Sequence, residues 1–495
     1  MAKLRQLLKE VEMTENVGNL DVNISGIEYN SQNVNKGSVF VAIKGFQRDG
    51  AEFIEEALEK GAVGVVLQEG TAMPNRIGDK TGAVVVKDSR KALASLSADF
   101  FGHPSRELDI VGITGTNGKT TIAYLLESIL QSAGKKTGVI GTINYRFGGK
   151  VKPAMQTTPE SLDLQKMFRE MADNKVDNCF LEVSSHSLML DRVYNTDFSV
   201  GVFTNLTQDH LDFHHTEEDY FKAKEKLFLE YKLKKAVVNV DDPYGKIISK
   251  KTSAETITIG IIEKSDVHAR NIETSIKGIQ FTAKTPQGEV QIVSGLLGRH
   301  NVYNILCAIA TAIALGVSLE EIKRGIGDLQ NVPGRLEKID EGQDFTVVVD
   351  YAHTDDALKN VLKAARELTD KSLISVFGCG GNRDRGKRPK MGKIAGEYSD
   401  YTIITSDNPR NEEPASIASE IEQGIKKVAG SEKYSLILDR KKAIRQAIDM
   451  AEKEDFVVIA GKGHENYQLS KNLRIHFDDC ETARELINEK LSMIN

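Results

Sequence analysis

Residues 108–121 read LDIVGITGTNGKTT, and the rest of the chain can be interpreted outward from them. The apolar first half predicts a buried strand, and apolar side chains at positions 125, 126, 129 and 130 predict an amphipathic helix after it. Between the two, Gly115 and Gly118 leave the backbone room to wrap its N–H groups around an anion, beside the partial positive charge of a helix start. A strand–loop–helix unit with a phosphate site at its loop is therefore predicted.

The loop residues are the candidate phosphate ligands. Lys119 supplies a cation for the outer phosphates, and the Thr120 hydroxyl can bind Mg²⁺. The strict phosphate-loop pattern has a glycine where this chain has Ile113, so an ordinary glycine turn remains an alternative. A strand before and a helix after the Lys-Thr pair favour a site for ATP or GTP. The candidate nucleotide-binding residues are Gly115, Thr116, Asn117, Gly118, Lys119, Thr120 and Thr121.

Length and composition narrow the class of protein. A chain of 495 residues is too long for one core and predicts about three domains. The net charge of −6 argues against nucleic-acid and anionic-membrane partners, and no apolar run is long enough to span a bilayer. The four cysteines include no CxxC pair, which predicts free thiols in a reducing cytoplasm. Residues 1–13 have apolar side chains at helical spacing, which favours an amphipathic helix over a signal peptide.

Strands and helices alternate along the chain, so we expect an α/β fold in three domains. Residues 1–106 predict a small N-terminal α/β domain, and residues 107–332 a central phosphate-loop ATPase domain with a parallel sheet. Residues 333–495 predict a doubly wound, Rossmann-like domain. In both larger domains the apolar runs end in polar clusters, as expected where parallel strands direct their carboxyl ends toward a ligand.

Several elements can be placed more closely. Two alternating segments, 279–284 and 290–294, flank a Pro-Gln-Gly turn and predict a hairpin. Apolar periodicity predicts helices over residues 301–315, 357–368 and 415–428.

The central domain contains a candidate metal site. Glu182 and the pair Asp209–His210 follow strands that should neighbour the phosphate-loop strand. A carboxylate and an imidazole beside Thr120 can hold Mg²⁺ on ATP phosphates. A lone histidine is more often an ordinary core or surface residue, but two such clusters beside a phosphate loop favour a metal. Spacing does not single out Lys224, because its segment holds several lysines and is typical of a solvated helix face.

Three arginines in the last domain lie near predicted strand ends. Arg383, Arg388 and Arg410 can each bind a carboxylate with the fork of the guanidinium group, which suits a small acidic substrate. A plain surface position is a fair alternative for Arg388. It is less favoured for Arg410, which follows Pro409 directly at a strand end.

Seven motifs resemble those of the Mur ligase family and occur in the family order. They are GTNGKTT (115–121), EVSSH (182–186), TNLTQDHLD (204–212), GRHNVYN (298–304), PGR (333–335), DYAHT (350–354) and GKGHE (461–465). Together they are highly specific and cover almost the whole chain. The resemblance implies a cytoplasmic peptidoglycan enzyme that binds its UDP-linked substrate in the first domain, ATP in the second and an amino acid in the third.

The implied reaction joins a diamino acid to the D-glutamate γ-carboxylate of UDP-N-acetylmuramoyl-L-alanyl-D-glutamate through an acyl phosphate, with hydrolysis of ATP. In the family the sequence D-N-P-R, here Asp407, Asn408, Pro409 and Arg410, marks meso-diaminopimelate as the added amino acid. A guanidinium group can bind, with two hydrogen bonds, the second carboxylate that distinguishes diaminopimelate from lysine. The alternatives are a lysine-adding ligase, a folylpolyglutamate synthetase-like ligase, and a nucleotide-dependent switch that forms no amide bond.

The resemblance also assigns roles near the nucleotide. Lys119, Lys224 and His210 are implied to be catalytic, with ATP and Mg²⁺ as cofactors. Lys224 occupies the position that family members carbamylate, which turns a cation that repels Mg²⁺ into an anionic oxygen ligand. The implied metal-site residues are Thr120, Glu182, His210 and Lys224. Asn301, Arg335 and Asp350 are implied to hold the nucleotide in addition to the phosphate loop.

The remaining implied residues bind the two other substrates. Those for the UDP-muramoyl-dipeptide are Ser31, Thr157, Thr158, Ser184 and Arg192. Those for diaminopimelate are Arg383, Asp407, Asn408, Pro409, Arg410, Gly461 and Glu465. Since residues of separate domains take part, we expect domain closure to gate turnover, in a monomer whose partners are small molecules.

The chain departs from the family pattern in a few places. The usual D-S-R near the uridine site is replaced by Asn30, Ser31 and Gln32, so a charge pair is lost there. Leu190 stands where some members have glutamine, and Asp355 where many have proline. None of these changes touches the phosphate loop or the D-N-P-R sequence.

Overall fold

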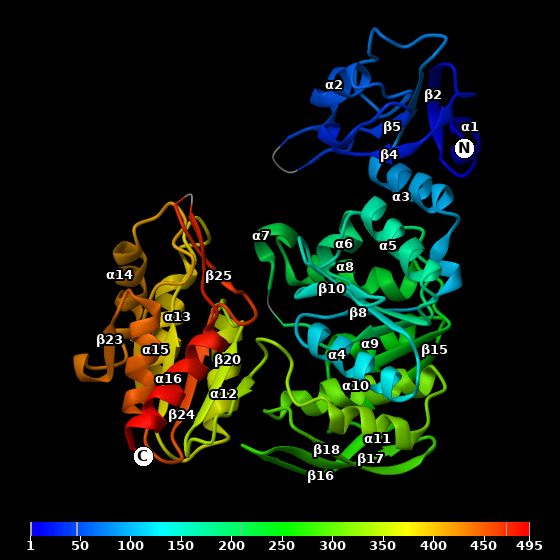
Figure 1. The fold of residues 1–495 in the computed structure, drawn as a ribbon. Helices are drawn as coiled ribbons and strands as arrows, with labels where there is room; N and C mark the ends of the chain where they lie inside the picture. Colours follow the sequence, from blue (N-terminus) through cyan, green and yellow to red (C-terminus); the bar gives the residue numbers. More distant parts are fainter. Residues whose placement is uncertain (1, 46–47, 208, 472, 495) are drawn as a thin grey trace. The chain divides into compact units, whose positions relative to one another are not determined.

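The computed structural model describes every residue except 1, 46–47, 208, 472 and 495. The fold is α/β (Figure 1). By internal contacts the chain divides into two compact units, residues 1–265 with 307–318 (unit 1) and residues 266–306 with 319–495 (unit 2). The proposed borders at 106/107 and 332/333 stay a prediction.

Unit 1 begins with a five-stranded sheet in the order β2-β7-β6-β5-β4. All neighbours are parallel except β2, which runs antiparallel to β7. Apolar clusters cover both faces of the sheet, beneath helices α2 (Ile54–Glu59) and α3 (Ser89–Phe100). The strands are β2 (Met13–Gly18), β4 (Gly26–Glu28), β5 (Ser38–Val41), β6 (Gly64–Gln68) and β7 (Gly82–Val86).

The predicted helix over residues 1–13 is wrong in its length. Helix α1 covers only Leu4–Leu7, between two short strands, β1 (Ala2–Lys3) and β2. The N–H groups at the start of α1 bind the carbonyls of Leu20 and Val22, in the segment that carries β3 (Asn23–Ile24). The apolar pattern nevertheless identified the inward face, because all four of its side chains are buried: Leu4, Leu7, Leu8 and Val11.

The second sheet of unit 1 positions the phosphate loop. Its order is β11-β10-β9-β12-β8-β13-β14-β15, and strands β9, β12, β8, β13, β14 and β15 run parallel. Strand β8, which leads into the loop, lies between β12 and β13, as predicted. The strands are β8 (Asp109–Thr114), β9 (Thr137–Ile140), β10 (Asn144–Phe147), β11 (Lys150–Pro153), β12 (Asn178–Glu182), β13 (Val200–Phe203), β14 (Lys235–Asn239) and β15 (Glu255–Gly260).

Helices cover both faces of this sheet. Helix α4 packs against β8, β9 and β12. Helices α5, α6, α8 and α9 instead contribute to a large apolar cluster that includes Cys179 and Leu181 of β12. The helices are α4 (Lys119–Ser132), α5 (Ser161–Asp173), α6 (Ser185–Met189), α7 (Leu211–His214), α8 (Glu217–Leu229) and α9 (Pro243–Lys251).

Unit 2 begins with the antiparallel strands β16 (Val267–Ser275), β17 (Gly278–Thr285) and β18 (Gly288–Ser294). The predicted hairpin is β17–β18, closed where Thr285 pairs with Gly288. The sequence did not predict β16. The predicted helix that follows is α10 (His300–Ala314), whose residues are divided between the two units, and α11 (Leu319–Asp328) comes next.

The second part of unit 2 is a doubly wound sheet in the order β19-β20-β24-β21-β22-β23, parallel except for β19. Helices α12, α13 and α14 share one apolar cluster, and α15 and α16 share another. The strands are β19 (Glu337–Ile339), β20 (Thr346–Asp350), β21 (Leu373–Phe377), β22 (Tyr401–Ile404), β23 (Tyr434–Leu436) and β24 (Phe456–Ala460), followed by the hairpin β25 (Tyr467–Ser470) and β26 (Leu473–His476). The helices are α12 (Asp355–Arg366), α13 (Lys387–Tyr398), α14 (Pro414–Ile425), α15 (Arg440–Met450) and α16 (Asp479–Ile494).

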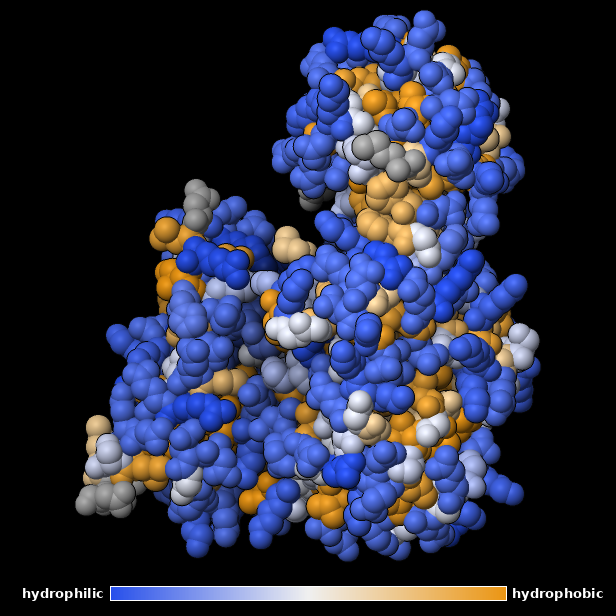
Figure 2. All heavy atoms as spheres, turned by 45° about the vertical axis from the view of Figure 1, so that its right-hand side comes forward, coloured by the Kyte–Doolittle hydropathy of each residue, from blue (hydrophilic) through white to orange (hydrophobic). Residues whose placement is uncertain are grey.

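Hydrophilic residues cover most of the surface visible in Figure 2. Apolar side chains show there only in scattered patches, and most of the large ones lie in the cores described above. Among the described residues, no helix combines the length and the apolar character needed to cross a membrane.

Candidate functional site

The phosphate loop lies between β8 and α4, as predicted. Gly115 has a φ of +145°, and a Cβ there would overlap Thr204 Oγ1 just after β13, so only glycine fits. Gly118 caps α4 with a φ of +91°. The N–H of Asn117 donates to the Asn205 side chain at 3.1 Å, and that of Thr116 donates to its carbonyl at 2.9 Å. The loop is therefore held in shape by the residues that follow β13.

Two lysines converge on one carbonyl of this loop. Lys119 Nζ donates to the carbonyls of Gly115 and Thr116 at 2.8 and 2.9 Å, and Lys224 Nζ donates to that of Gly115 at 2.9 Å. Lys224 is only 1% exposed, so the solvated-face interpretation of its position is wrong. Burial, together with the nearby Lys119 cation, holds the pKa of Lys224 well below its usual range.

Glu182, the last residue of β12, is 1% exposed, and its carboxylate accepts hydrogen bonds from Thr120 and Thr142. Its Oε2 accepts from the Thr120 hydroxyl at 3.1 Å and from the Thr142 hydroxyl at 2.9 Å, and its Oε1 accepts from the Thr142 N–H at 3.0 Å. The predicted pair Thr120 and Glu182 is thus in contact. Thr142 was missed in the sequence, where the only signal was its position just after the strand that neighbours β12.

His210 lies on the segment after β13, in the left-handed region with a φ of +52°. Its ring centroid is 4.9 Å from that of His186 and 6.1 Å from that of Tyr220, whose hydroxyl lies 3.2 Å from Thr116 Oγ1. His210 therefore approaches the phosphate loop by way of Tyr220. Gln208, in the same motif, lies outside the described residues.

The oxygen ligands around Glu182 suit a hard cation, but the protein side chains alone do not complete a metal site. No group of three or more His, Cys, Asp and Glu residues able to hold a metal occurs in the described part of the chain. Buried carboxylate and hydroxyl oxygens at Glu182 and Thr120 are the ligand type that Mg²⁺ prefers, and Mg²⁺ keeps several waters and substrate oxygens as further ligands. A site of this kind fits Mg²⁺ carried on phosphates.

Four of the five residues predicted for the UDP-linked substrate lie together. Thr158 Oγ1 donates to the Glu182 carbonyl at 2.7 Å and accepts from the Ser184 N–H at 3.1 Å. Arg192 donates to the Thr158 carbonyl at 3.1 Å, and burial lowers the pKa of its guanidinium. Thr157 lies 3.1 Å from Thr142, hydroxyl to hydroxyl.

Ser31, the fifth predicted residue, belongs to the N-terminal sheet region, in the short turn Ser31–Asn33. Its hydroxyl donates to Glu56 at 3.0 Å, and its carbonyl accepts from Lys60 at the same distance. These partners come from α2 and its C-terminal end, so the described contacts do not join Ser31 to the other four residues.

The other predicted nucleotide residues belong to unit 2. Asp350 ends β20 and accepts from the N–H groups of Leu336 and Ala352 at 2.7 and 2.8 Å, while its burial raises the pKa of the carboxyl. Arg335 lies 5.3 Å from the ring centroid of Tyr351, next to Asp350. Asn301, on α10, donates to the Leu297 carbonyl at 2.7 Å.

The carboxyl ends of β22 and β24 bring the predicted amino-acid residues together. Asn408 donates to Glu465 at 2.8 Å, and burial raises the pKa of the Glu465 carboxyl. Lys462, itself fully buried, lies 3.6 Å from Asp407 and 3.4 Å from Glu465. Gly461 has a φ of +114°, and a Cβ there would be 3.6 Å from Asp407 Oδ2. The result is a polar cluster with two carboxylates around one ammonium.

Arg410 borders this cluster. It has a φ of +53°, its N–H donates to the Leu469 carbonyl at 3.0 Å, and its guanidinium donates to the Gly381 carbonyl at 2.9 Å. Pro409, just before it, is buried, and a Cβ on Gly381 would overlap the Pro409 carbonyl oxygen. Close packing of the loops after β21 and β22 therefore fixes the path of Arg410.

The other two arginines separate clearly. Arg383 is exposed in the loop after β21. Arg388 is 0% exposed and pairs at 2.9 Å with Glu412 and with Glu420, so the surface interpretation of this residue is wrong. Arg388 braces the loop that carries Arg410 by joining α13 to the segment around α14.

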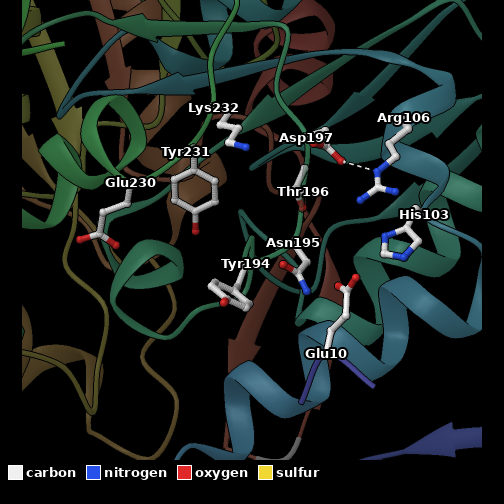
Figure 3. A pocket seen from close by; sticks show the side chains of 10 residues that line it. All are labelled: Glu10, His103, Arg106, Tyr194, Asn195, Thr196, Asp197, Glu230, Tyr231 and Lys232. Carbon is white, nitrogen blue, oxygen red and sulfur yellow. Dashed lines mark hydrogen bonds and ion pairs between the residues drawn. The ribbon is translucent and has the colours of Figure 1, made fainter. Parts of the chain in front are cut away.

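A separate pocket of about 270 Å³ lies within unit 1 (Figure 3). Glu10, His103 and Arg106 line one side, and residues 194–197 and 230–232 line the other. Arg106 and Asp197 form an ion pair at 3.2 Å across it. It contains none of the residues predicted for the site.

Three family models match the chain: Mur ligase family, catalytic domain over residues 23–101, Mur ligase middle domain over 113–312, and Mur ligase, glutamate ligase domain over 334–463. The UDP-N-acetylmuramoyl-L-alanyl-D-glutamate–2,6-diaminopimelate ligase of Alkaliphilus metalliredigens is 47% identical over 496 residues, covering 99% of this chain and 98% of the relative. A solved structure of a ligase with the same name is 32% identical, with a TM-score of 0.72 and 99% of each chain covered.

More distant structures share the fold alone. The MurF ligase of Thermotoga maritima in complex with ADP is 20% identical, with a TM-score of 0.62, and covers 96% of this chain and 99% of that one. Three findings point to the same family: the seven motifs, the three matching models, and the identity to the Alkaliphilus enzyme over 99% of the chain. The chain belongs to the Mur ligase family.

Proposed function

We propose that the chain is an ATP-dependent UDP-N-acetylmuramoyl-L-alanyl-D-glutamate–2,6-diaminopimelate ligase. It forms an amide bond between meso-diaminopimelate and the D-glutamate γ-carboxylate of the UDP-linked dipeptide, in peptidoglycan precursor synthesis. The observation that carries this conclusion is the 47% identity to such a ligase over 99% of the chain. The intact D-N-P-R sequence, with Arg410 fixed at the edge of a buried polar cluster, supports the same amino acid.

ATP is one of the three substrates, and the phosphate loop is its proposed site. Lys119 would move from the Gly115 carbonyl to the β- and γ-phosphates, where its cation offsets the charge that develops during phosphoryl transfer. Mg²⁺, held by Thr120, Glu182 and His210 with the phosphate oxygens, would supply Lewis-acid stabilisation of the same charge. The helix start at Gly118 adds its own partial positive charge.

Lys224 is proposed to act as a carbamate. Its lowered pKa favours the neutral amine, and a neutral Nζ can attack CO₂, forming an N–C bond and releasing one proton. The product is an anionic carbamate beside the phosphate loop. Its oxygens can bind a metal cation, which the original amine cannot do as well. The buried position next to the Gly115 carbonyl supports this role.

The amide bond then forms in two steps on the dipeptide. The D-glutamate γ-carboxylate attacks the γ-phosphorus of ATP, giving an acyl phosphate and ADP. The free amine of diaminopimelate attacks the acyl carbon, a tetrahedral intermediate forms, and phosphate leaves with the carbonyl restored. Thr157, Thr158, Ser184 and Arg192 are proposed to hold the muramoyl-peptide next to Glu182 during both steps. Ser31 is proposed to contact the uridine end.

Selection of diaminopimelate is proposed to depend on charge. Arg410 and Arg383 would bind the distal carboxylate of diaminopimelate. The carboxylates of Asp407 and Glu465 would face the distal ammonium group of the same ligand. The shape of the pocket would come from Asn408, Pro409 and Gly461. Lysine lacks that carboxylate and would leave Arg410 without its anion in a closed site. A lysine-adding or folylpolyglutamate-forming activity is therefore not favoured.

The cellular setting follows from the reaction. Both ATP and a UDP-linked precursor are cytoplasmic metabolites, so we place the enzyme in the cytoplasm. Its partners are small molecules, and the net charge of −6 supports the absence of a nucleic-acid partner. We propose a monomer.

The amino-acid preference decides between the ligases. The purified chain is given ATP, Mg²⁺ and UDP-N-acetylmuramoyl-L-alanyl-D-glutamate with either meso-diaminopimelate or L-lysine, and phosphate release and the tripeptide mass are measured. We expect product with diaminopimelate and a rate at least about tenfold lower with lysine, the factor for losing one charged hydrogen bond. Preference for lysine would overturn the substrate. ATP hydrolysis that responds to neither substrate, with no tripeptide, would indicate a switch.

A further inference from the structure

We propose that Thr142 is a positioning residue whose hydroxyl couples the nucleotide site to the muramoyl-peptide site. It joins Glu182, at the predicted metal site, to Thr157, at the predicted peptide site. The inference rests on the proposed function for the identity of the two ligands. It adds a link between them that the family motifs do not assign.

The link is a short chain of side chains in unit 1. Thr120, at the start of α4, lies 3.1 Å from Glu182 Oε2, and Glu182 Oε2 lies 2.9 Å from Thr142 Oγ1. Thr142 Oγ1 in turn lies 3.1 Å from Thr157 Oγ1. Four oxygen-bearing side chains from separate segments therefore connect the phosphate loop with the residues that surround Thr158.

Glu182 has little freedom to leave this arrangement. It is 1% exposed, and its Oε1 is held by the Thr142 N–H at 3.0 Å. Gly141 leaves no spare room, since a Cβ there would overlap Glu182 Oε1. Thr142 thus contacts both oxygens of one carboxylate, through its backbone and through its side chain.

Counting protons fixes the direction of each hydrogen bond. A carboxylate oxygen only accepts, so the hydroxyls of Thr120 and Thr142 both donate to Glu182 Oε2. A hydroxyl has one proton, so Thr142 cannot also donate to Thr157, and Thr157 must donate to Thr142. In this state Thr157 presents only lone pairs to the peptide site.

If Glu182 held a cation, the carboxylate would accept less strongly from the two hydroxyls, and the Thr142 hydroxyl would be free to turn its proton toward Thr157. Thr157 would then accept from Thr142, and its own proton would become a donor toward the peptide site. The Thr142 hydroxyl is therefore a two-position element that the ligands at both ends bias, and the coupling must be reciprocal.

The test measures binding rather than turnover. Calorimetry gives the Kd of UDP-N-acetylmuramoyl-L-alanyl-D-glutamate with and without Mg²⁺ and a non-hydrolysable ATP analogue, for the wild type, Thr142→Val and Thr142→Ser. We expect a ratio of the two Kd values of about tenfold in the wild type, within the usual range of coupling between sites. Thr142→Val removes the hydroxyl but keeps the shape, and the ratio falls to about one. Thr142→Ser keeps the proton and the ratio.

Two further variants keep the test decisive. Thr157→Val breaks the other end of the chain and should also abolish the coupling, which covers the case in which Thr142→Val does not fold. Thr137→Val is the matched control, because the Thr137 hydroxyl accepts from Gln131 and Thr137 is the first residue of β9, the strand after which Thr142 lies. Its ratio should equal that of the wild type.

The outcomes separate the inference from the function on which it rests. If the wild type does not bind the UDP-linked dipeptide at all, the proposed function fails and the inference fails with it. Two results would overturn only the role of Thr142, provided that the wild type binds the dipeptide. One is a Kd ratio of one in the wild type, and the other is the same Kd ratio in the wild type and in folded Thr142→Val.

Discussion

At the scale of single residues, burial separates Lys224 from its neighbours on α8. The side chain of Lys222 is 60% exposed and paired with Glu218, which raises the pKa of Lys222, whereas the pKa of buried Lys224 is lowered. Of these two lysines, Lys224 is therefore the one whose environment favours the neutral amine. In ¹³CO₂-equilibrated enzyme we expect one carbamate ¹³C signal, retained in Lys222→Ala and absent in Lys224→Ala. The signal should vanish as the pH falls through the lowered pKa, because protonation removes the nucleophile.

Activity provides the second readout for Lys224. Lys224→Ala should abolish turnover, and added bicarbonate should not restore it, since no amine is left to carbamylate. A fully active Lys224→Ala enzyme would exclude the carbamate from the mechanism.

Arg410 carries the prediction for substrate choice. Arg410→Ala should raise the KM for diaminopimelate by about 10- to 100-fold, the range for a lost charged hydrogen bond, and leave the affinity for ATP unchanged. Arg385, whose side chain is 66% exposed and paired with Glu420, is the matched control, and Arg385→Ala should leave both constants near those of the wild type. An equal loss of ATP and diaminopimelate binding in Arg410→Ala would contradict the assigned contact.

These residues also show where sequence reasoning ends. The contact between Thr120 and Glu182 was predictable because the strands and the loop that carry them have strong local patterns. Arg388 was not, since its burial depends on Glu412 and Glu420, which lie 24 and 32 residues later in the chain. Distant packing, rather than local pattern, decides which charged residues are buried.

At the scale of elements, the turn after β9 holds the Glu182 carboxylate in place. A Cβ on Gly141 would overlap Glu182 Oε1, so Gly141→Ala must displace the carboxylate. We expect the Mg²⁺ concentration for half-maximal activity to rise by about 10- to 100-fold, as for other changes to groups that orient metal ligands. Gly78→Ala, with open space around the new Cβ, is the control and should be unchanged. Unaltered Mg²⁺ dependence in folded Gly141→Ala would remove Glu182 from the metal site.

Elements were predictable in proportion to their regularity. Strands β8, β12 and β13 lie where continuous apolar runs predicted them, and the hairpin β17–β18 lies where alternation and a turn predicted it. The helix over residues 1–13 was wrong, although its apolar face is buried, because one turn of helix buries the same side chains when neighbouring strands hold its ends. Periodicity therefore identifies the buried face more reliably than the length of the element.

At the scale of the whole molecule, the proposed chemistry divides between the two units. Lys119, Glu182 and Lys224, which are proposed to serve phosphoryl transfer, belong to unit 1. Arg410 and Glu465, which are proposed to select the incoming amine, belong to unit 2. Acyl-phosphate formation should therefore be separable from amine selection by mutation.

Positional isotope exchange measures that separation. ATP with ¹⁸O in the β,γ-bridge is incubated with enzyme and the UDP-linked dipeptide, without diaminopimelate. Reversible formation of the acyl phosphate lets the β-phosphate of bound ADP rotate, so the label should scramble in the wild type. Arg410→Ala should scramble at the wild-type rate, although its net reaction at low diaminopimelate is slower by about 10- to 100-fold. Lys224→Ala should not scramble. If Arg410→Ala loses scrambling as fully as it loses net turnover, the two units do not divide the reaction in this way, because the arginine would then be needed before the amine arrives.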